Sequence, residues 1–330
     1  MPLVPMKQIL DEAVKGGYGV GAYNVNNMEQ LQGIMRAASE TKSPVIIQAS
    51  RGALAYTNMY YIKYMVQASV EDNPGIPMAL HLDHGNSFET CKQAIGLGFT
   101  SVMIDGSLKE DSKTPTNFEE NVAITKEVVD YAHKLGVSVE GELGTLGGIE
   151  DGVGSGKVML TDPEEAVKFI GLTGVDALAL AIGTSHGAYK FKVKPKLELD
   201  IISSIQEKIP GMPLVMHGSS SVPAELIDAV NQYGGKLEKA MGVPIESIQE
   251  AIKRGIRKIN VDTDGRLAIT GAIRKYMAEN PAAFDPRTYF GEAREAVYRT
   301  VKGKMEAFGT AGHAGDYSFL TLEDMKKKYN

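Results

Sequence analysis

The chain has 330 residues, a formal net charge of −6 and a single cysteine, Cys91. Hydrophobic residues make up 43% and charged residues 23%, an ordinary globular balance that excludes a disordered tail, a collagen and a coiled coil. No apolar run approaches the roughly 18 residues of a membrane helix. The negative net charge attracts neither nucleic acid nor anionic lipid, so we expect neither nucleic acid nor a membrane as a partner. One cysteine excludes a disulfide framework and a cysteine-based zinc site, and it suits a cytoplasmic protein.

Short apolar runs alternate with longer helical patterns along the chain, which is typical of βα units around a parallel sheet. The eight predicted strands are 19–24, 44–49, 77–83, 101–105, 137–143, 176–183, 213–218 and 256–262. Helical patterns separate them, for example over 27–41, 117–135 and 162–172. Eight such units predict an α/β fold, a single (β/α)8 TIM barrel over residues 1–330 with helical C-terminal additions. The alternative is a doubly wound open sheet.

Polar residues follow nearly every predicted strand. In chain order they are Asn24, Ser50, Asp83 with His84, Asp105, Glu142, His186, His217, and Asn260 with Asp262. Active sites of TIM barrels lie at the carboxyl ends of the strands, so this regularity favours the barrel over the open sheet.

Three of these residues are histidines from different strands: His84, His186 and His217. Neutral imidazole is a good zinc ligand, and three protein ligands with one open position describe a catalytic zinc site. The alternative is three separate histidines, each hydrogen-bonded in its own loop. Their shared position at one rim of the barrel favours the metal site.

Carboxylates at the same rim provide acid and base groups. Asp83 precedes a predicted ligand, so it suits either proton transfer to a bound substrate or orientation of a histidine. Asp105 and Glu142 are either oxygen ligands for a metal or partners of nearby basic groups. Glu150 lies in the glycine-rich stretch 142–157, which is either a mobile lid or a solvated acidic turn.

Two of the ionisable residues inside the predicted strands are considered separately, His81 and Lys258. His81 shares a strand face with Asp83, and we expect it beside the site without ligating the metal. Lys258 is expected to leave the barrel at its end. His133 on a helix and His313 in a C-terminal loop are expected to have no role in the site.

The segments 217–221 and 260–264 follow the seventh and eighth strands, the usual place for a phosphate site in a barrel. Gly218, Ser219 and Ser220 can offer backbone N–H groups and hydroxyls to an anion. Ser50 after the second strand marks a second anion site, so the substrate is expected to carry two phosphates or to break into two phosphorylated fragments. The basic residues considered for these anions are Lys190, Arg266 and Arg287.

Seven segments of the chain together resemble the class II, metal-dependent fructose-bisphosphate aldolases, in their longer-chain subgroup, over nearly the full length. They are AYNVNN (22–27), HLDHG (81–85), SVMIDGS (101–107), VEGELGTLGGIEDGV (139–153), AIGTSHGAYK (181–190), VMHGSSS (215–221) and NVDTD (260–264). The resemblance implies a barrel that reversibly cleaves fructose 1,6-bisphosphate to dihydroxyacetone phosphate and glyceraldehyde 3-phosphate, in glycolysis or gluconeogenesis, through an enediolate that a metal stabilises.

The resemblance also implies roles for the site residues. His84, His186 and His217 would bind the catalytic zinc, and Asp105 and Glu142 would form a second metal position. Asp83 would handle the proton of the C4 hydroxyl, and Glu150 would exchange a proton of dihydroxyacetone phosphate. The residues matching contacts to dihydroxyacetone phosphate are Gly187, Gly218, Ser219, Ser220, Asn260, Val261, Asp262 and Thr263.

Other implied features concern the aldehyde end and assembly. Ser50 matches a contact to the aldehyde fragment, and Arg287 matches an arginine that a neighbouring subunit supplies to the distal phosphate, so a homodimer or homotetramer is expected. A monovalent cation, Na+ or K+, is expected near the phosphate. The alternatives are a tagatose-bisphosphate aldolase, which Arg266 after NVDTD disfavours, and a metal-dependent barrel hydrolase, which the absence of any His-x-His pair disfavours.

Overall fold

The computed structural model of the chain describes residues 3–148, 158–187 and 195–330. Eight parallel strands pair in chain order, and the eighth pairs with the first, so the sheet closes into a barrel. The predicted TIM barrel is confirmed, and the open-sheet alternative is wrong. Every predicted strand overlaps an observed one. The strands are β1 (Val20–Asn24), β2 (Val45–Ser50), β3 (Met78–Gly85), β4 (Ser101–Ile104), β5 (Ser138–Leu143), β6 (Ala177–Leu180), β7 (Leu214–Met216) and β8 (Ile256–Val261).

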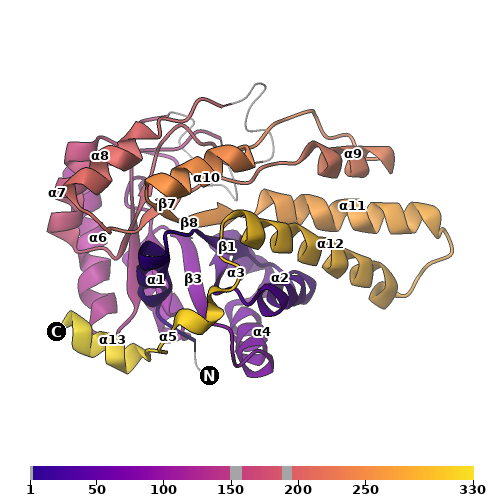
Figure 1. Cartoon of the computed structure of the whole chain (residues 1–330), viewed down its shortest axis with the longest axis horizontal. Helices are drawn as coiled ribbons and strands as arrows, with labels where there is room; N and C mark the ends of the chain where they lie inside the picture. The colour runs from indigo at the N-terminus through magenta and orange to yellow at the C-terminus, as the bar shows by residue number, and fades with distance from the viewer. Residues whose placement is uncertain (1–2, 149–157, 188–194) are drawn as a thin grey trace.

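Helices surround this sheet and continue beyond it (Figure 1). Within the described residues they are α1 (Met6–Gly16), α2 (Met28–Thr41), α3 (Arg51–Thr57), α4 (Met59–Asp72), α5 (Phe88–Gly96), α6 (Phe118–His133), α7 (Pro163–Thr173), α8 (Asp200–Lys208), α9 (Ala224–Gln232), α10 (Ile245–Arg254), α11 (Thr263–Glu279), α12 (Pro286–Ala307) and α13 (Leu322–Tyr329), with a 3-10 turn η1 (His313–Asp316). The three helices expected from the sequence, α2, α6 and α7, are confirmed. Their side-chain caps, Asn27, Asn117 and Asp162, each accept a backbone N–H of the first turn.

The hydrophobic core has two parts, because successive strand residues face opposite sides of the sheet. Side chains such as Val45 and Ile47 face outward and pack against the helices in the larger cluster. Inside the barrel, small side chains such as Ala22 and Ala79 leave room for α1, whose apolar face packs against them. Helix α1 therefore closes the amino-terminal end of the barrel, and the opposite end remains for polar groups.

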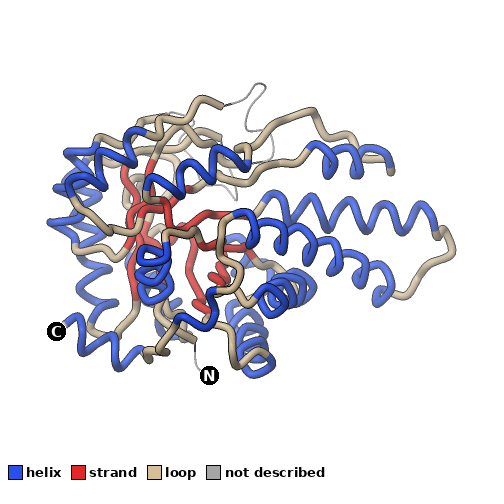
Figure 2. Tube along the Cα trace, viewed as in Figure 1, coloured by secondary structure: helices blue, strands red, loops and turns tan. Residues whose placement is uncertain are grey.

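Helices α11 and α12 form a long arm that extends from one side of the barrel, with α9 beside it (Figures 1 and 2). Helix α12 runs along α2, and a Cβ atom at Gly33 of α2 would lie 2.8 Å from the backbone oxygen of Arg294. Glycine is thus needed for this close helix contact. Among the described helices, none combines the length and apolar character needed to cross a membrane.

Candidate metal centre and active site

The three histidines from separate strands converge at the carboxyl end of the barrel. His84 belongs to β3, His217 directly follows β7, and His186 lies in the loop after β6, where its N–H donates to the carbonyl of Gly147 over 2.8 Å. The three rings lie 4.8–6.2 Å apart between centroids. One nitrogen from each ring lies within 4.8 Å of the others. Zinc–nitrogen bonds of about 2.0–2.1 Å place the ligands of one ion roughly 3–4 Å apart, so the cluster is of the right size.

The hydrogen bonds of two of these rings decide which nitrogens face the centre. His84 Nδ1 lies 3.1 Å from Asp105 Oδ2, and His217 Nε2 lies 2.8 Å from Glu140 Oε1, so each of these nitrogens directs its N–H to a carboxylate. The remaining nitrogens, His84 Nε2 and His217 Nδ1, are 3.1 Å apart. Two lone pairs this close repel each other unless a proton or a metal ion lies between them, so the donor set fits a bound cation.

Carboxylates around the histidines favour that positive charge. Burial alone would lower the pKa of His84, but Asp83, Asp105 and Glu142 raise it to about 10. The pKa of the Glu142 carboxyl lies well above its usual value, because the group is buried and faces Asp105. His84, Asp105 and Glu142 also offer ligand atoms within 4.8 Å of one another, so this group could hold a metal ion as well.

Asp83 lies on the same rim and is held by side-chain amides. Its Oδ2 accepts a hydrogen bond from Asn24 Nδ2 over 3.0 Å, and its Oδ1 accepts one from Asn260 Nδ2 over 3.2 Å. Burial would raise the pKa of Asp83, but the nearby His84 and Lys258 bring it below its usual value, so the group is an ionised carboxylate. An ionised, oriented carboxylate can accept a proton from a substrate hydroxyl.

The backbone of β3 lets two consecutive residues serve one site. In a regular strand, Asp83 and His84 would face opposite sides of the sheet. His84 instead has a left-handed backbone, with φ at +52°, and the register with β4 shifts between Leu82 and Gly85. This irregularity brings the ring of His84 to the rim beside Asp83, and such irregularities are concentrated at functional sites.

A buried charged group beneath the histidines was missed by the sequence analysis. Glu140 of β5 is fully buried and contacts His217, His81 and Lys258. The expectation that Lys258 leaves the barrel at its end is wrong: its side chain is fully buried, because the inward face of β8 directs it into the barrel interior. Glu140 lies two residues before Glu142 and shares its strand face, which is the signal that could have identified it.

The predicted anion-binding segments lie together after β7 and β8. Gly218 has a positive φ of +61°, and a Cβ atom there would lie 2.5 Å from the carbonyl oxygen of Ser185. Ser220 Oγ accepts the N–H of Asp262 over 3.2 Å, so the two segments contact each other. The other residues predicted to bind this anion are also near strand ends: Gly187 lies in the loop after β6, Ser219 follows β7, Asn260 and Val261 end β8, and Thr263 begins α11.

The remaining predicted residues are Glu150, Lys190, Arg266, Arg287 and Ser50. Glu150 and Lys190 lie outside the described residues. Arg266 of α11 pairs with Asp262, with Nε 2.8 Å from Oδ1. Arg287 lies in the first turn of α12 and pairs with Asp285, and Figure 1 shows that α12 begins at the end of the arm away from the barrel. Ser50 ends β2 at the rim, where its Oγ caps α3.

The other two histidines are placed as expected, away from the rim. His133 of α6 contacts Asp176 over 2.9 Å, and His313 of η1 contacts Asp316 over 2.6 Å. Both contacts lie outside the barrel, and neither involves a residue of the histidine cluster.

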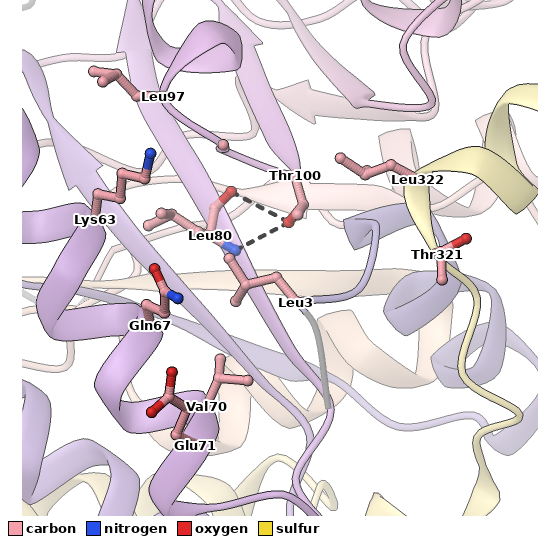
Figure 3. A pocket seen from close by; sticks show the side chains of 11 residues that line it. Leu3, Lys63, Gln67, Val70, Glu71, Leu80, Leu97, Thr100, Thr321 and Leu322 are labelled. Carbon is pink, nitrogen blue, oxygen red and sulfur yellow. Dashed lines mark hydrogen bonds between the residues drawn. The ribbon is translucent and has the colours of Figure 1, made fainter.

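A cavity of about 370 Å³ lies between α4, β3 and the start of α13 (Figure 3). Its walls include Leu3, Leu80, Leu97 and Leu322, and the hydroxyl of Thr100 accepts the N–H of Leu80 over 3.1 Å. The loop before β4 and the start of α13 place the cavity at the amino-terminal end of the barrel. That end of a TIM barrel serves stability, so the cavity is not part of the candidate site.

Comparisons with known proteins agree with this geometry. The family model "Fructose-bisphosphate aldolase class-II" matches residues 4–313. A fructose-bisphosphate aldolase of Giardia intestinalis is 57% identical, with all of both chains covered, and a class 2 enzyme of Synechocystis is 53% identical over all of this chain and 96% of its own. The crystal structure of the YdjI aldolase from Escherichia coli K12 matches with a TM-score of 0.75 and 30% identity, covering 94% of this chain and 99% of that one. The chain belongs to the class-II fructose-bisphosphate aldolase family.

Proposed function

We propose that this protein is a lyase that reversibly cleaves fructose 1,6-bisphosphate to dihydroxyacetone phosphate and glyceraldehyde 3-phosphate. The observation that carries the proposal is the convergence of His84, His186 and His217 beside the oriented carboxylate of Asp83. Family membership and the names of the relatives support the same reaction and a phosphorylated sugar substrate.

The three histidines would hold a zinc ion. Bound zinc supplies an electrophile that polarises a substrate carbonyl and stabilises negative charge on it. Asp105 and Glu142, together with His84, would provide the second metal position. Asp105 also accepts the N–H of His84 and of no other described imidazole, so it holds that ring in one tautomer. A Na+ or K+ ion near the phosphate is part of the proposal on the strength of the family resemblance.

Proton transfer is assigned to two carboxylates. Asp83 would take the proton of the C4 hydroxyl during cleavage and return it during condensation. A carboxylate has about four acceptor positions, and the amides of Asn24, Gln48 and Asn260 use three of them, which leaves one for substrate. Glu150, outside the described residues, would exchange a proton of dihydroxyacetone phosphate.

The phosphates would be bound at both sides of the barrel mouth. Backbone N–H groups and hydroxyls after β6, β7 and β8 would bind dihydroxyacetone phosphate, with Lys190 and Arg266 as further basic groups, through Gly187, Gly218, Ser219, Ser220, Asn260, Val261, Asp262 and Thr263. Ser50 would contact the aldehyde fragment. Arg287 would reach the distal phosphate of a neighbouring subunit, in a homodimer or homotetramer, which suits its position far from its own barrel.

The remaining assignments follow from the same proposal. Residues 1–330 would form one catalytic domain. The enzyme would act in the cytoplasm, in glycolysis or gluconeogenesis.

The test is a coupled cleavage assay with fructose 1,6-bisphosphate and with tagatose 1,6-bisphosphate, each with and without EDTA. We expect fructose-selective activity that EDTA abolishes and zinc restores. Preference for tagatose would keep the chemistry and overturn the substrate. Activity that survives complete metal removal would overturn the role of the three histidines.

A further inference from the structure

Lys258 is the central residue of a buried polar network beneath the candidate metal centre. It lies in β8, and its side chain is 0% exposed. A buried ammonium ion is costly unless it is paired and hydrogen-bonded, so its partners indicate why it is there. The Nζ atom lies 3.0 Å from Glu140 Oε2, 3.3 Å from Glu140 Oε1 and 2.7 Å from Asn260 Oδ1.

The first partner connects Lys258 to a metal-ligand candidate. Glu140 Oε1 accepts the Nε2–H of His217 over 2.8 Å, which leaves Nδ1 of that ring to face the other histidines. Lys258 Nζ lies 3.3 Å from this same oxygen and 3.0 Å from Oε2. A buried cation therefore balances the Glu140 carboxylate and holds it in place as the acceptor for the ring.

The second partner connects Lys258 to the candidate acid–base carboxylate. An ammonium group can only donate hydrogen bonds, and an ionised carboxylate can only accept them. The amide of Asn260 lies between the two, with Oδ1 toward Lys258 and Nδ2 toward Asp83 Oδ1, 3.2 Å away. Lys258 thereby holds the amide in the one orientation that donates to Asp83. Without Lys258, the amide of Asn260 can rotate and turn its oxygen toward the Asp83 carboxylate, and the two oxygen groups would then repel each other.

We infer that Lys258 is a positioning residue that orients two groups of the site. It orients the His217 ring through Glu140, and the Asp83 carboxylate through Asn260. The strands β5 and β8 are not neighbours in the sheet, so the contact between Glu140 and Lys258 crosses the barrel interior. One buried cation thus ties metal binding to proton transfer. The part of this inference that concerns Asp83 rests on the proposed function; the part that concerns metal binding does not.

The experiment compares the wild-type full chain with the double variant E140Q/K258M, which removes both charges together and leaves no unpaired ion in the core. Zinc affinity is measured by competition with a chromogenic chelator, and ligand geometry by the visible absorption of the Co2+-substituted protein. We expect zinc binding about 10- to 100-fold weaker, the usual effect of losing the carboxylate behind a ligand histidine, and an altered cobalt spectrum. At saturating zinc, we expect cleavage of fructose 1,6-bisphosphate to fall about tenfold more than proton exchange into dihydroxyacetone phosphate, because only cleavage uses Asp83.

The matched control is D264N/K304M, which removes another buried ion pair, with a 2.6 Å contact between α11 and α12. It should lower the melting temperature and leave zinc affinity and the cobalt spectrum unchanged. A folded E140Q/K258M protein with wild-type zinc affinity and spectrum would overturn the inference, as would an equal loss of affinity in the control. If E140Q/K258M does not fold, E140D decides: it keeps the charge but is too short to contact both partners, so wild-type affinity there would also overturn the inference. Failure of the wild-type enzyme to cleave the substrate would refute the proposed function and leave the zinc and cobalt measurements valid.

Discussion

The substitution Asp264→Asn should strongly lower the free energy of unfolding, because Asp264 binds both a strained loop and a buried lysine. Its carboxylate is fully buried and accepts the N–H groups of Ser221 over 2.9 Å and Val222 over 2.8 Å. Lys304 of α12 lies 2.6 Å from the same group and is 6% exposed. Val222 has a φ of +46°, an unfavourable conformation for a β-branched residue that costs on the order of 1–3 kcal/mol.

The magnitude follows from what the amide cannot do. An asparagine keeps one acceptor oxygen, but its NH2 group then faces either a backbone N–H or the lysine ammonium, and the charge of Lys304 is left unpaired. Breaking a buried ion pair in this way costs about 3–5 kcal/mol of unfolding free energy. The loop that begins at Gly218 would also relax, so we expect a higher KM for fructose 1,6-bisphosphate with zinc still bound.

The assay is equilibrium unfolding in urea at one protein concentration, for D264N, K304M and the double variant D264N/K304M. The double variant should be less destabilised than the sum of the single ones, because no uncompensated ion remains. A cost below about 1 kcal/mol for Asp264→Asn, or strict additivity of the two substitutions, would refute the reasoning.

Three further predictions concern the site and its surroundings. Asp83→Ala should keep zinc but lose about 10²- to 10⁴-fold in kcat, measured with metal analysis of the same sample; loss of zinc in step with activity would contradict its role in proton transfer. Gly218→Ala should raise KM for the substrate, since its Cβ would lie 2.5 Å from a backbone oxygen at a φ of +61°, and an unchanged KM would show that the loop does not bind phosphate. Acid should destabilise the wild-type protein more than D264N/K304M: burial would raise the pKa of Asp264, but Lys304 and two N–H groups bring it below its usual value. As the pH falls, the unfolded chain takes up this proton first. The stabilisation by Asp264 is therefore present above about pH 4 and is lost as the pH falls toward the lowered pKa. Urea titrations from pH 6 downward would measure this loss, and an equal dependence of unfolding free energy on pH in the two proteins would refute it.

The order of strands and the position of the three histidines could be predicted from the sequence, because both depend on local patterns. Alternation of apolar runs and helical patterns marked the βα units, and nearly every strand was followed by a polar residue. Since barrel closure brings all carboxyl ends to one rim, His84, His186 and His217 were predicted together without knowledge of any distance.

The network beneath the histidines depended on tertiary structure alone. Glu140 and Lys258 are 118 residues apart and meet across the barrel interior, and Asp264 meets Lys304 through the packing of α12. A charged residue in a strand looks the same in sequence whether its side chain leaves the barrel or enters it, and this is why Lys258 was misplaced. The direction of each inward side chain, and the identity of its partner on a strand far away in sequence, are set only when the sheet closes.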